Sequence, residues 1–281
     1  MEVLRNELLS KHTTIKVGGN AILYHIPDDK DELLKLLKSI GNDKFYVISG
    51  GSNLLINDEK SFENVIYMGK VDESICHISD GVFYCGASVR IQQLIKSAKM
   101  AGYGGIEYLY SLPAMLGGIV CMNAGRGKDV GCSISDVVLE VYAINNGTEL
   151  TLSKEQCNFS YRKSIFRDSS YIITGVKLRL IPQDGEKTEK RIQERLELCK
   201  SNQDHSGGTF GTVFSSASAT ILYICQKLSK KSGIHWSQKR GNWFINDGTG
   251  TFQQAYKLMK RCELLHKLSG KKVKAEVCIW K

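Results

Sequence analysis

The sequence predicts an α+β fold built in two parts. Its 281 residues suffice for about two domains, and 42% of them are hydrophobic, which is enough to fill cores. Apolar residues recur at helical spacing in some segments and alternate as in strands in others, so helices and strands are mixed. The composition changes at residues 183–186 (QDGE), where a charged segment follows, and we place the domain boundary there.

The first part begins with a β-α-β pattern. Residues 29–40 (DKDELLKLLKSI) predict an amphipathic helix opened by acidic residues, and the strand 45–48 (FYVI) follows it. We expect Ser88 to cap a second helix and Gly102 to end it in a left-handed conformation. The apolar residues of this helix recur at helical spacing; they are Ile91, Leu94, Ile95 and Ala98.

A hairpin and a further strand complete the first part. Residues 137–144 and 149–152 flank the turn Asn145-Asn146-Gly147, whose Asn-Gly pair is typical of a two-residue hairpin. Residues 171–180 alternate as a strand. In the second part, the elements that we predict are a charged helix over 189–200, a helix over 252–266 and a terminal strand over 273–280.

The composition excludes several protein classes. No apolar stretch approaches the roughly 20 residues of a membrane span, and the first six residues (MEVLRN) contain no apolar signal region. We therefore expect a soluble, cytoplasmic protein without a membrane partner. The nine cysteines are scattered and include no C-x-x-C pair, which predicts reduced thiols and no metal site.

The formal charge of +9 favours anionic small-molecule ligands, although a lysine-rich solvated surface has the same composition. The lysines are spread through predicted helices and turns and do not form one basic arm. No nucleic-acid-binding motif is present, so we expect no nucleic-acid partner.

Residues 49–56 (SGGSNLLI) are the most informative stretch, because paired glycines follow the strand 45–48 directly. Adjacent glycines let backbone N–H groups approach an anion, and Ser52 and Asn53 add side-chain donors. The segment predicts a diphosphate cradle that lacks the G-x-G-x-x-G spacing of a dinucleotide-binding helix. An ordinary glycine-rich turn between two strands remains the alternative.

Residues 108–125 (YLYSLPAMLGGIVCMNAG) combine one proline and three glycines with apolar residues. The scarcity of polar groups predicts a buried loop packed against something flat and apolar. A well-packed core loop is one interpretation. A flavin ring lying against the backbone accounts better for the repeated small residues.

Four motifs in one order resemble the UDP-N-acetylenolpyruvoylglucosamine reductase family. Residues 12–21 (HTTIKVGGNA) are similar to its N-T-x-x-x-G-G-x-A opening, and 50–55 (GGSNLL) to its pyrophosphate loop. Residues 112–118 (LPAMLGG), followed by 123–125 (NAG), are similar to its I-P-G-x-x-G-G … N-x-G flavin loop. Residues 160–166 (SYRKSIF) are close to its G-Y-R-x-S-x-F segment. Similar segments in the last third extend the resemblance over nearly the whole chain.

The resemblance implies a flavoenzyme of peptidoglycan precursor synthesis in the cytoplasm. It would use non-covalent FAD with NADPH as co-substrate, act as a monomer and reduce the enolpyruvyl group of a UDP sugar. The implied fold is an FAD-binding region of the vanillyl-alcohol-oxidase/PCMH type with a smaller α+β substrate-binding domain. The implied ranges are 1–183 for the FAD-binding region (subdomains 1–68 and 69–183), 184–270 for the substrate domain and 271–281 for a terminal strand.

The resemblance also implies site residues. Arg162 would hold the substrate carboxylate, Thr212 would protonate C2, and Glu276 would hydrogen-bond the enolic oxygen. The implied cofactor-binding residues are Gly50, Gly51, Ser52, Asn53, Leu54, Pro113, Gly117, Gly118, Asn123 and Gly125. The implied substrate-binding residues are Tyr161, Ser164, Lys239 and Arg240.

The second part departs from the family pattern. Thr212 replaces the family's serine, and 215–217 (SSA) lack its basic or amide residue and its proline. Gln226 stands in place of an acidic residue, and Arg240 in place of a histidine. Two other readings therefore stay open: a paralogous FAD-dependent oxidoreductase acting on another nucleotide sugar or a secondary metabolite, and a non-catalytic flavin- or nucleotide-binding regulator.

Overall fold

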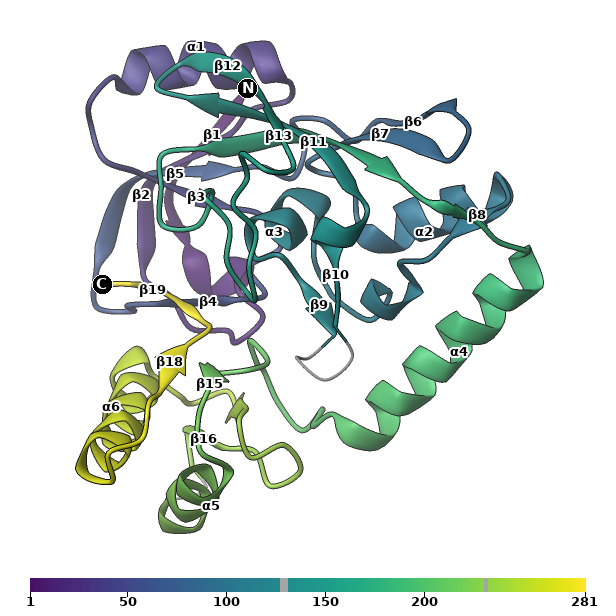
Figure 1. Ribbon diagram of the computed structural model, residues 1–281. Helices are drawn as coiled ribbons and strands as arrows, with labels where there is room; N and C mark the ends of the chain where they lie inside the picture. Colours follow the sequence, from purple (N-terminus) through teal and green to yellow (C-terminus); the bar gives the residue numbers. More distant parts are fainter. Residues whose placement is uncertain (127–130, 230–231) are drawn as a thin grey trace. The chain divides into compact units, whose positions relative to one another are not determined.

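The structure, a computed structural model, describes residues 1–126, 131–229 and 232–281 (Figure 1). The chain forms two compact units. Unit 1 consists of Met1–Leu4, Tyr24–Ser49 and Asn64–Lys200, and unit 2 of Arg5–Leu23, Gly50–Glu63 and Ser201–Lys281. Each unit is therefore assembled from segments that are far apart in the sequence.

The larger sheets of unit 1 have four and five strands, and β1, β2 and β5 of the first extend past the unit boundary. The first has the order β1-β2-β5-β3, in which β3 runs parallel to β5 with Phe45 opposite Asn64. The second has the order β12-β11-β13-β7-β6, and its neighbouring strands are antiparallel. Their strands are β1 (Glu2–Leu8), β2 (Asn20–Ile26), β3 (Phe45–Ile48), β5 (Ser61–Tyr67), β6 (Ile75–Ser79), β7 (Val82–Gly86), β11 (Val138–Asn145), β12 (Thr148–Ser153) and β13 (Ile172–Arg179).

Helices and short strands complete unit 1. The helices are α1 (Lys30–Ile40), α2 (Ile91–Met100), α3 (Leu116–Cys121) and α4 (Gly185–Asn202), whose last two residues lie past the unit boundary. The 3₁₀ turns in the described part of unit 1 are η2 (Glu107–Leu109) and η3 (Ile134–Asp136). The short strands are β8 (Tyr103–Gly104), β9 (Gly125–Arg126), β10 (Cys132–Ser133) and β14 (Ile181–Pro182).

Local sequence signals account for the helix and hairpin ends. Asp29 caps α1 by accepting the N–H of Glu32 at 2.8 Å. Asn146 and Gly147 have φ of 49° and 73°, so both central residues of the β11–β12 hairpin adopt the positive φ that a type I′ turn requires. The predicted helix over 29–40, the strand over 45–48 and the hairpin are confirmed.

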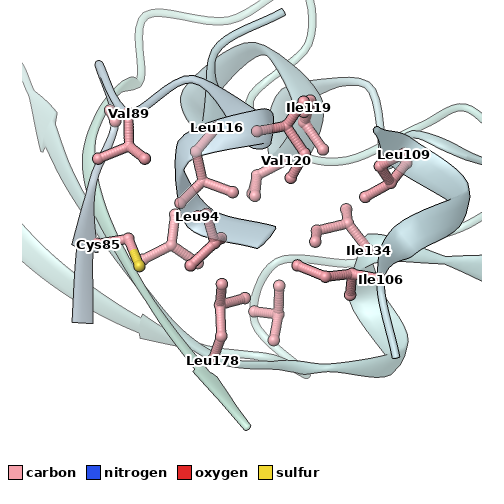
Figure 2. Packing of buried hydrophobic residues seen from close by; sticks show 14 of the residues in the cluster. Cys85, Val89, Leu94, Ile106, Leu109, Leu116, Ile119, Val120, Ile134 and Leu178 are labelled. Carbon is pink, nitrogen blue, oxygen red and sulfur yellow. The ribbon is translucent and has the colours of Figure 1, made fainter. Parts of the chain in front are cut away.

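Two predictions for residues 88–125 are wrong. Ser88 does not cap α2, because its hydroxyl bonds to the carbonyl oxygen of Met68 and accepts the N–H of Asp72; Arg90 is the residue before the helix. Residues 108–125 are not one loop, since they contain the end of η2 and all of α3. Their apolar side chains fill the unit's own core, where Leu109, Leu116, Ile119 and Val120 lie together (Figure 2).

A buried carboxylate fixes the start of α4 to unit 1. Glu107 is 3% exposed and accepts hydrogen bonds from Gln183 Nε2 at 2.8 Å and from Arg191 Nη1 at 3.5 Å. The charged helix predicted over 189–200 begins earlier, at Gly185, and it packs with unit 1. The compact units describe packing, and the functional ranges 1–183, 184–270 and 271–281 stay a prediction.

Unit 2 is loop-rich and has an aromatic core. Trp236 and Phe244 are both fully buried, with ring centroids 4.5 Å apart, and Phe214 stacks on Trp236 at 6.3 Å. The helices are α5 (Ala219–Leu228) and α6 (Phe252–Leu268), with the 3₁₀ turn η1 (Leu9–His12). The strands are β4 (Leu54–Ile56), β15 (Phe214–Ser216), β16 (Ile234–Trp236), β17 (Phe244–Asn246), β18 (Lys274–Ala275) and β19 (Cys278–Trp280).

The predicted terminal strand over 273–280 is wrong in one respect, because it is broken into two. β18 pairs antiparallel with β15, whereas β19 pairs parallel with β4 (Figure 1). The chain bends at Glu276 and Val277 between these partners. Glu276 therefore lies at the point where the C-terminal segment changes from one partner strand to the other.

Candidate active site

The glycine loop that precedes β4 is packed against the N-terminal segment of unit 2. Gly51 has φ of +59°, and a Cβ added there would lie 1.8 Å from the carbonyl oxygen of His12. The N–H of Thr14 donates to the carbonyl oxygen of Gly51 at 3.1 Å. Only glycine fits this position, for reasons of both conformation and space.

The same loop presents backbone donors. In the described part of the chain, no hydrogen bond joins the N–H groups of Gly50, Gly51 and Ser52 to a protein acceptor. Consecutive N–H groups beside a positive-φ glycine form an anion-binding concavity. The residues present therefore fit the diphosphate of a dinucleotide such as FAD.

Asn53 connects this loop to Glu276. Its Nδ2 donates to the carbonyl oxygen of Glu276 at 3.3 Å, and its own carbonyl oxygen accepts the N–H of Cys278 at 3.0 Å. Leu54, which follows, is paired with Cys278 in the β4–β19 ladder. The backbone of Glu276 is thus held directly beside the glycine loop.

Thr212 is anchored in the same unit. It forms an antiparallel bridge with Trp243 and follows Gly211, which has φ of +80°. The N–H of Val213 donates to the carbonyl oxygen of Asn242 at 2.9 Å, and the N–H of Glu276 donates to the carbonyl oxygen of Val213 at 2.8 Å. Glu276 therefore bonds to the residue that follows Thr212, which holds Thr212 and Glu276 on two neighbouring backbone segments. Both side chains are partly exposed.

Asn242 stabilises this arrangement, and the sequence did not single it out as a site residue. Its Oδ1 accepts the N–H of Phe214 at 3.1 Å, and its Nδ2 donates to the carbonyl oxygen of Phe214 at 2.8 Å. A side-chain amide offers the same donor and acceptor as a peptide group, so the amide of Asn242 pairs with the backbone of Phe214 as a neighbouring strand would. The only signal in the sequence was its place in residues 242–246 (NWFIN), one of the segments in the last third that extend the family resemblance.

Arg162 lies in a tight turn of unit 1. Ser160 and Lys163 exchange two backbone hydrogen bonds of 3.0 Å, and Arg162 between them has φ of +55°. Its Nη2 donates to the carbonyl oxygen of Gly125 at 2.9 Å. The ring of Tyr161, a 41% exposed residue, lies 5.6 Å from the Arg162 guanidinium carbon.

A cavity of about 320 Å³ lies beside this turn in unit 1. Its lining is mostly small and polar, with two aromatic side chains and two arginines, and a guanidinium such as that of Arg162 can hold a carboxylate. The lining residues of this cavity are Asn123, Gly125, Arg126, Gly131, Cys132, Ser133, Ser135, Phe159, Ser160, Tyr161 and Arg162.

The other residues of the predicted flavin loop differ in their surroundings. Pro113 is exposed. Gly117 donates its N–H to the carbonyl oxygen of Ala87 at 2.9 Å, and an added Cβ would lie 3.0 Å from the Ala87 methyl. At Gly118, an added Cβ would lie 3.2 Å from the Ser49 hydroxyl. Side chains at these two glycines would therefore crowd their neighbours.

Ser164, Lys239 and Arg240 also have defined environments. The buried Ser164 hydroxyl donates to the carbonyl oxygen of Cys121 at 2.7 Å and accepts the N–H of Phe166, so it supports the protein backbone. The N–H groups of Lys239 and Arg240 donate to the Ser237 hydroxyl oxygen at 3.1 and 2.8 Å. This turn presents two exposed cationic residues.

Several titratable groups of unit 1 stay neutral near pH 7. Burial raises the pKa of the Cys85 thiol to about 12 and that of the Cys157 thiol to about 11. Burial, assisted by the Asp136 carboxylate, also raises the pKa of the Tyr108 phenol. None of these three groups is a base at neutral pH.

All nine cysteines are free thiols. Within residues 1–126, 131–229 and 232–281, no group of three or more His, Cys, Asp or Glu side chains is arranged to hold a metal ion. None of the described helices is long and apolar enough to cross a membrane.

Comparison with known proteins identifies the family. Residues 21–153 match the family model of the FAD binding domain. UDP-N-acetylenolpyruvoylglucosamine reductase from Carboxydothermus hydrogenoformans is 31% identical over 98% of this chain and 93% of its own length. The enzyme of that name from Geobacter metallireducens is 30% identical over 89% of this chain and 84% of its own length. The chain belongs to the UDP-N-acetylenolpyruvoylglucosamine reductase family.

A solved structure supports the same assignment. The crystal structure of UDP-N-acetylenolpyruvylglucosamine reductase from Thermus caldophilus has a TM-score of 0.82 to this chain, with 27% identity and full coverage of both chains. Membership of the reductase family confirms the resemblance found in the sequence. The predicted α+β fold with an FAD-binding region of the PCMH type is also confirmed.

We expect Gly51→Ala to abolish most FAD binding, because the added methyl would collide with the His12 carbonyl oxygen and reshape the loop. Gly41→Ala is the matched control: Gly41 has φ of +60°, but no atom lies within 4 Å of an added Cβ. Gly41 combines this positive φ with ψ of −119°, so Gly41→Ala also carries backbone strain, but without a collision. The measurement is the ratio of flavin to protein absorbance after purification, and wild-type flavin content in Gly51→Ala would contradict the assignment.

Proposed function

We propose that this protein catalyses the NADPH-dependent reduction of the enolpyruvyl group of UDP-N-acetylglucosamine enolpyruvate to UDP-N-acetylmuramate, in peptidoglycan precursor synthesis. The observation that carries the proposal is the bonded pair of segments that holds Thr212 and Glu276 together, beside the glycine loop. Membership of the reductase family supports the same reaction. The cytoplasm is the proposed compartment and a monomer the proposed working form.

The glycine loop is the proposed site for the FAD diphosphate, through the N–H groups of Gly50, Gly51 and Ser52 with Asn53 and Leu54 following. Pro113, Gly117, Gly118 and Gly125 are the proposed residues for the flavin. Bound non-covalently and reduced by NADPH, FAD supplies the hydride that C3 of the enolpyruvyl group accepts. The functional ranges 1–183, 184–270 and 271–281 are part of this proposal.

Arg162 is the proposed partner of the substrate carboxylate. Negative charge on that carboxylate increases when hydride reaches C3, and a planar guanidinium can hold both oxygens in fixed geometry. The Gly125 carbonyl oxygen already orients one guanidinium nitrogen at 2.9 Å, which limits the freedom of the side chain. Orientation before the reaction reduces the entropy lost in reaching the transition state.

Thr212 and Glu276 have the proposed roles of proton donor and enolate partner. The Thr212 hydroxyl can give its proton to C2, and the Glu276 carboxyl can hydrogen-bond the enolic oxygen. Their backbones are joined through Val213 by a bond of 2.8 Å, which keeps the two groups in register. Tyr161 in unit 1 and Lys239 and Arg240 in unit 2 are proposed contacts for the sugar and its diphosphate, because each of these residues is exposed.

A second candidate function is reduction of another nucleotide sugar or a secondary metabolite on the same scaffold. The observation that favours it is Ser215, whose hydroxyl donates to the Lys274 carbonyl oxygen at 3.3 Å. The family pattern resembled by this segment has a basic or amide residue and a proline after the proton donor. A serine bonded to backbone cannot make the ligand contacts of a long polar side chain.

Anaerobic half-reactions test the proposal. We expect NADPH to bleach the yellow protein, and UDP-N-acetylglucosamine enolpyruvate to restore its colour with formation of UDP-N-acetylmuramate. Reduction by NADPH without any reoxidation by this sugar would contradict the proposed substrate and favour the second candidate.

Arg162→Lys is expected to slow reoxidation by the sugar far more than it weakens sugar binding, since a point ammonium cannot reproduce the guanidinium fork. Reduction by NADPH should stay near the wild-type rate. The two half-reactions are measured separately by stopped-flow absorbance. An equal fall in both would assign Arg162 to cofactor binding or fold support.

Thr212→Ala is expected to lower turnover by about 10²–10⁴-fold, because general acid catalysis typically contributes that factor. Thr212→Ser should retain or improve activity, since it keeps the hydroxyl and removes a methyl that restricts χ1. Product formation by each variant is measured under saturating NADPH and sugar. Wild-type turnover in Thr212→Ala would show that another group donates the proton.

A further inference from the structure

The side chain of Asn123 joins three segments of unit 1. Its Nδ2 donates to the carbonyl oxygen of Ser160 at 2.9 Å, and its Oδ1 accepts the N–H of Ser135 at 3.2 Å. Asn123 is 5% exposed, so both bonds lie in a region where losing one leaves a polar group without water. The amide thus ties the end of α3 to η3 and to the Arg162 turn.

The bond to Ser160 acts on the turn itself. The carbonyl oxygen of Ser160 also accepts the N–H of Lys163, which closes the turn around Tyr161 and Arg162. The Ser160 carbonyl oxygen therefore accepts two hydrogen bonds: the one from Lys163 closes the turn, and the one from Asn123 joins the turn to the end of α3. Arg162 has φ of +55°, a backbone conformation that residues other than glycine rarely adopt. The turn therefore depends on hydrogen bonds from other segments, such as the one from Asn123.

Asn123 is itself in a left-handed conformation, with φ of +41°. Its N–H donates to the carbonyl oxygen of Val120 at 3.0 Å, which continues the turn at the end of α3. Asparagine tolerates this conformation better than most residues. Aspartate and glycine also tolerate it, so they can replace Asn123 with little backbone strain.

Gly125, two residues later, holds the other end of Arg162. Its carbonyl oxygen accepts Arg162 Nη2, and an added Cβ would lie 2.1 Å from the Cys132 carbonyl oxygen. Residues 123–125 therefore contact the Arg162 turn twice, once at its backbone and once at the guanidinium. Both contacts lie at the cavity that Asn123, Gly125 and Arg162 line.

We infer that Asn123 acts through its side chain as a positioning residue for Arg162 and is not a direct ligand of the cofactor. The inference rests on the proposed function for the chemical role of Arg162. It deepens that proposal, because it names the group that sets the angle at which the guanidinium meets a carboxylate.

Asn123→Asp is the sharpest variant, since it keeps the size, the acceptor for Ser135 and the tolerance of positive φ. It replaces the donor to Ser160 with a carboxylate oxygen that repels the carbonyl oxygen. Asn123→Gly removes the side-chain hydrogen bonds to Ser160 and Ser135, and it is the test variant if Asn123→Asp fails to fold. Asn158→Asp and Asn158→Gly are matched controls, because Asn158 also has positive φ (47°) and is exposed two residues before Ser160.

Four measurements are made on holoenzyme. The FAD dissociation constant should stay within about twofold of wild type for Asn123→Asp, and reduction by NADPH should be unchanged. Reoxidation by the UDP-enolpyruvyl sugar should slow by up to about 10²-fold, the effect of misplacing a group by about 1 Å. Limited trypsinolysis should cleave the bond after Arg162 faster in both Asn123 variants than in the Asn158 controls.

Three results would overturn the inference. One is a loss of FAD affinity that accounts for the whole loss of rate, because this is the behaviour of a cofactor ligand. Another is trypsin cleavage after Arg162 at the control rate. Adding Asn123→Asp to Arg162→Lys should cost little beyond the single change, and additive losses would also contradict it. Trypsinolysis needs no substrate, so it tests the inference even if the sugar fails to reoxidise wild-type protein.

Discussion

The parallel pairing of β19 with β4 is the constraint on which the chemistry of unit 2 depends. It joins the last strand to the segment after the glycine loop and places the carbonyl oxygen of Glu276 3.3 Å from the amide of Asn53, 223 residues away in the chain. Closing so long a loop costs conformational entropy that only a firm contact can offset. The backbone bond from Glu276 to Val213 then extends this constraint to the residue beside Thr212.

Asparagine side chains replace missing sheet contacts around both sets of functional residues. Asn242 bonds to both backbone groups of Phe214, and Asn246 donates to the carbonyl oxygen of Ile15 while accepting the N–H groups of Gly248 and Gly250. Asn123 does the same in unit 1. Loops without a ladder leave peptide groups unpaired, and an amide satisfies a donor and an acceptor at once.

Gly51 and Gly125 differ from Ser215 in how strongly the fold restricts the side chain. Gly51 and Gly125 are required by space, since an added Cβ would lie 1.8 and 2.1 Å from carbonyl oxygens. No such restriction applies to Ser215, whose side chain is partly exposed. A change of side chain is therefore compatible with the fold at Ser215 and incompatible with it at Gly51 and Gly125.

The sequence alone determined the elements that depend on local interactions and the family that the chain belongs to. The Asp29 cap, the Asn146-Gly147 turn and the period of α1 involve contacts within a few residues, so their patterns can be read directly. The motif order was sufficient to indicate the reductase family and its FAD-binding fold, which comparison then confirmed. Arg162 as a candidate came from one of these motifs, and Thr212 and Glu276 came from the similar segments in the last third of the chain.

Only the tertiary structure decided which groups these residues contact. Ser88 bonds to Met68 instead of capping α2, and the terminal segment divides between β15 and β4. The apolar residues of 108–125 fill the core of unit 1, which the sequence offered only as one of two interpretations. The supporting roles of Asn123 and Asn242 likewise depend on carbonyl groups 37 and 28 residues away. Periodicity reports neighbours along one element, whereas these bonds join separate segments whose pairing is set by packing of the whole unit.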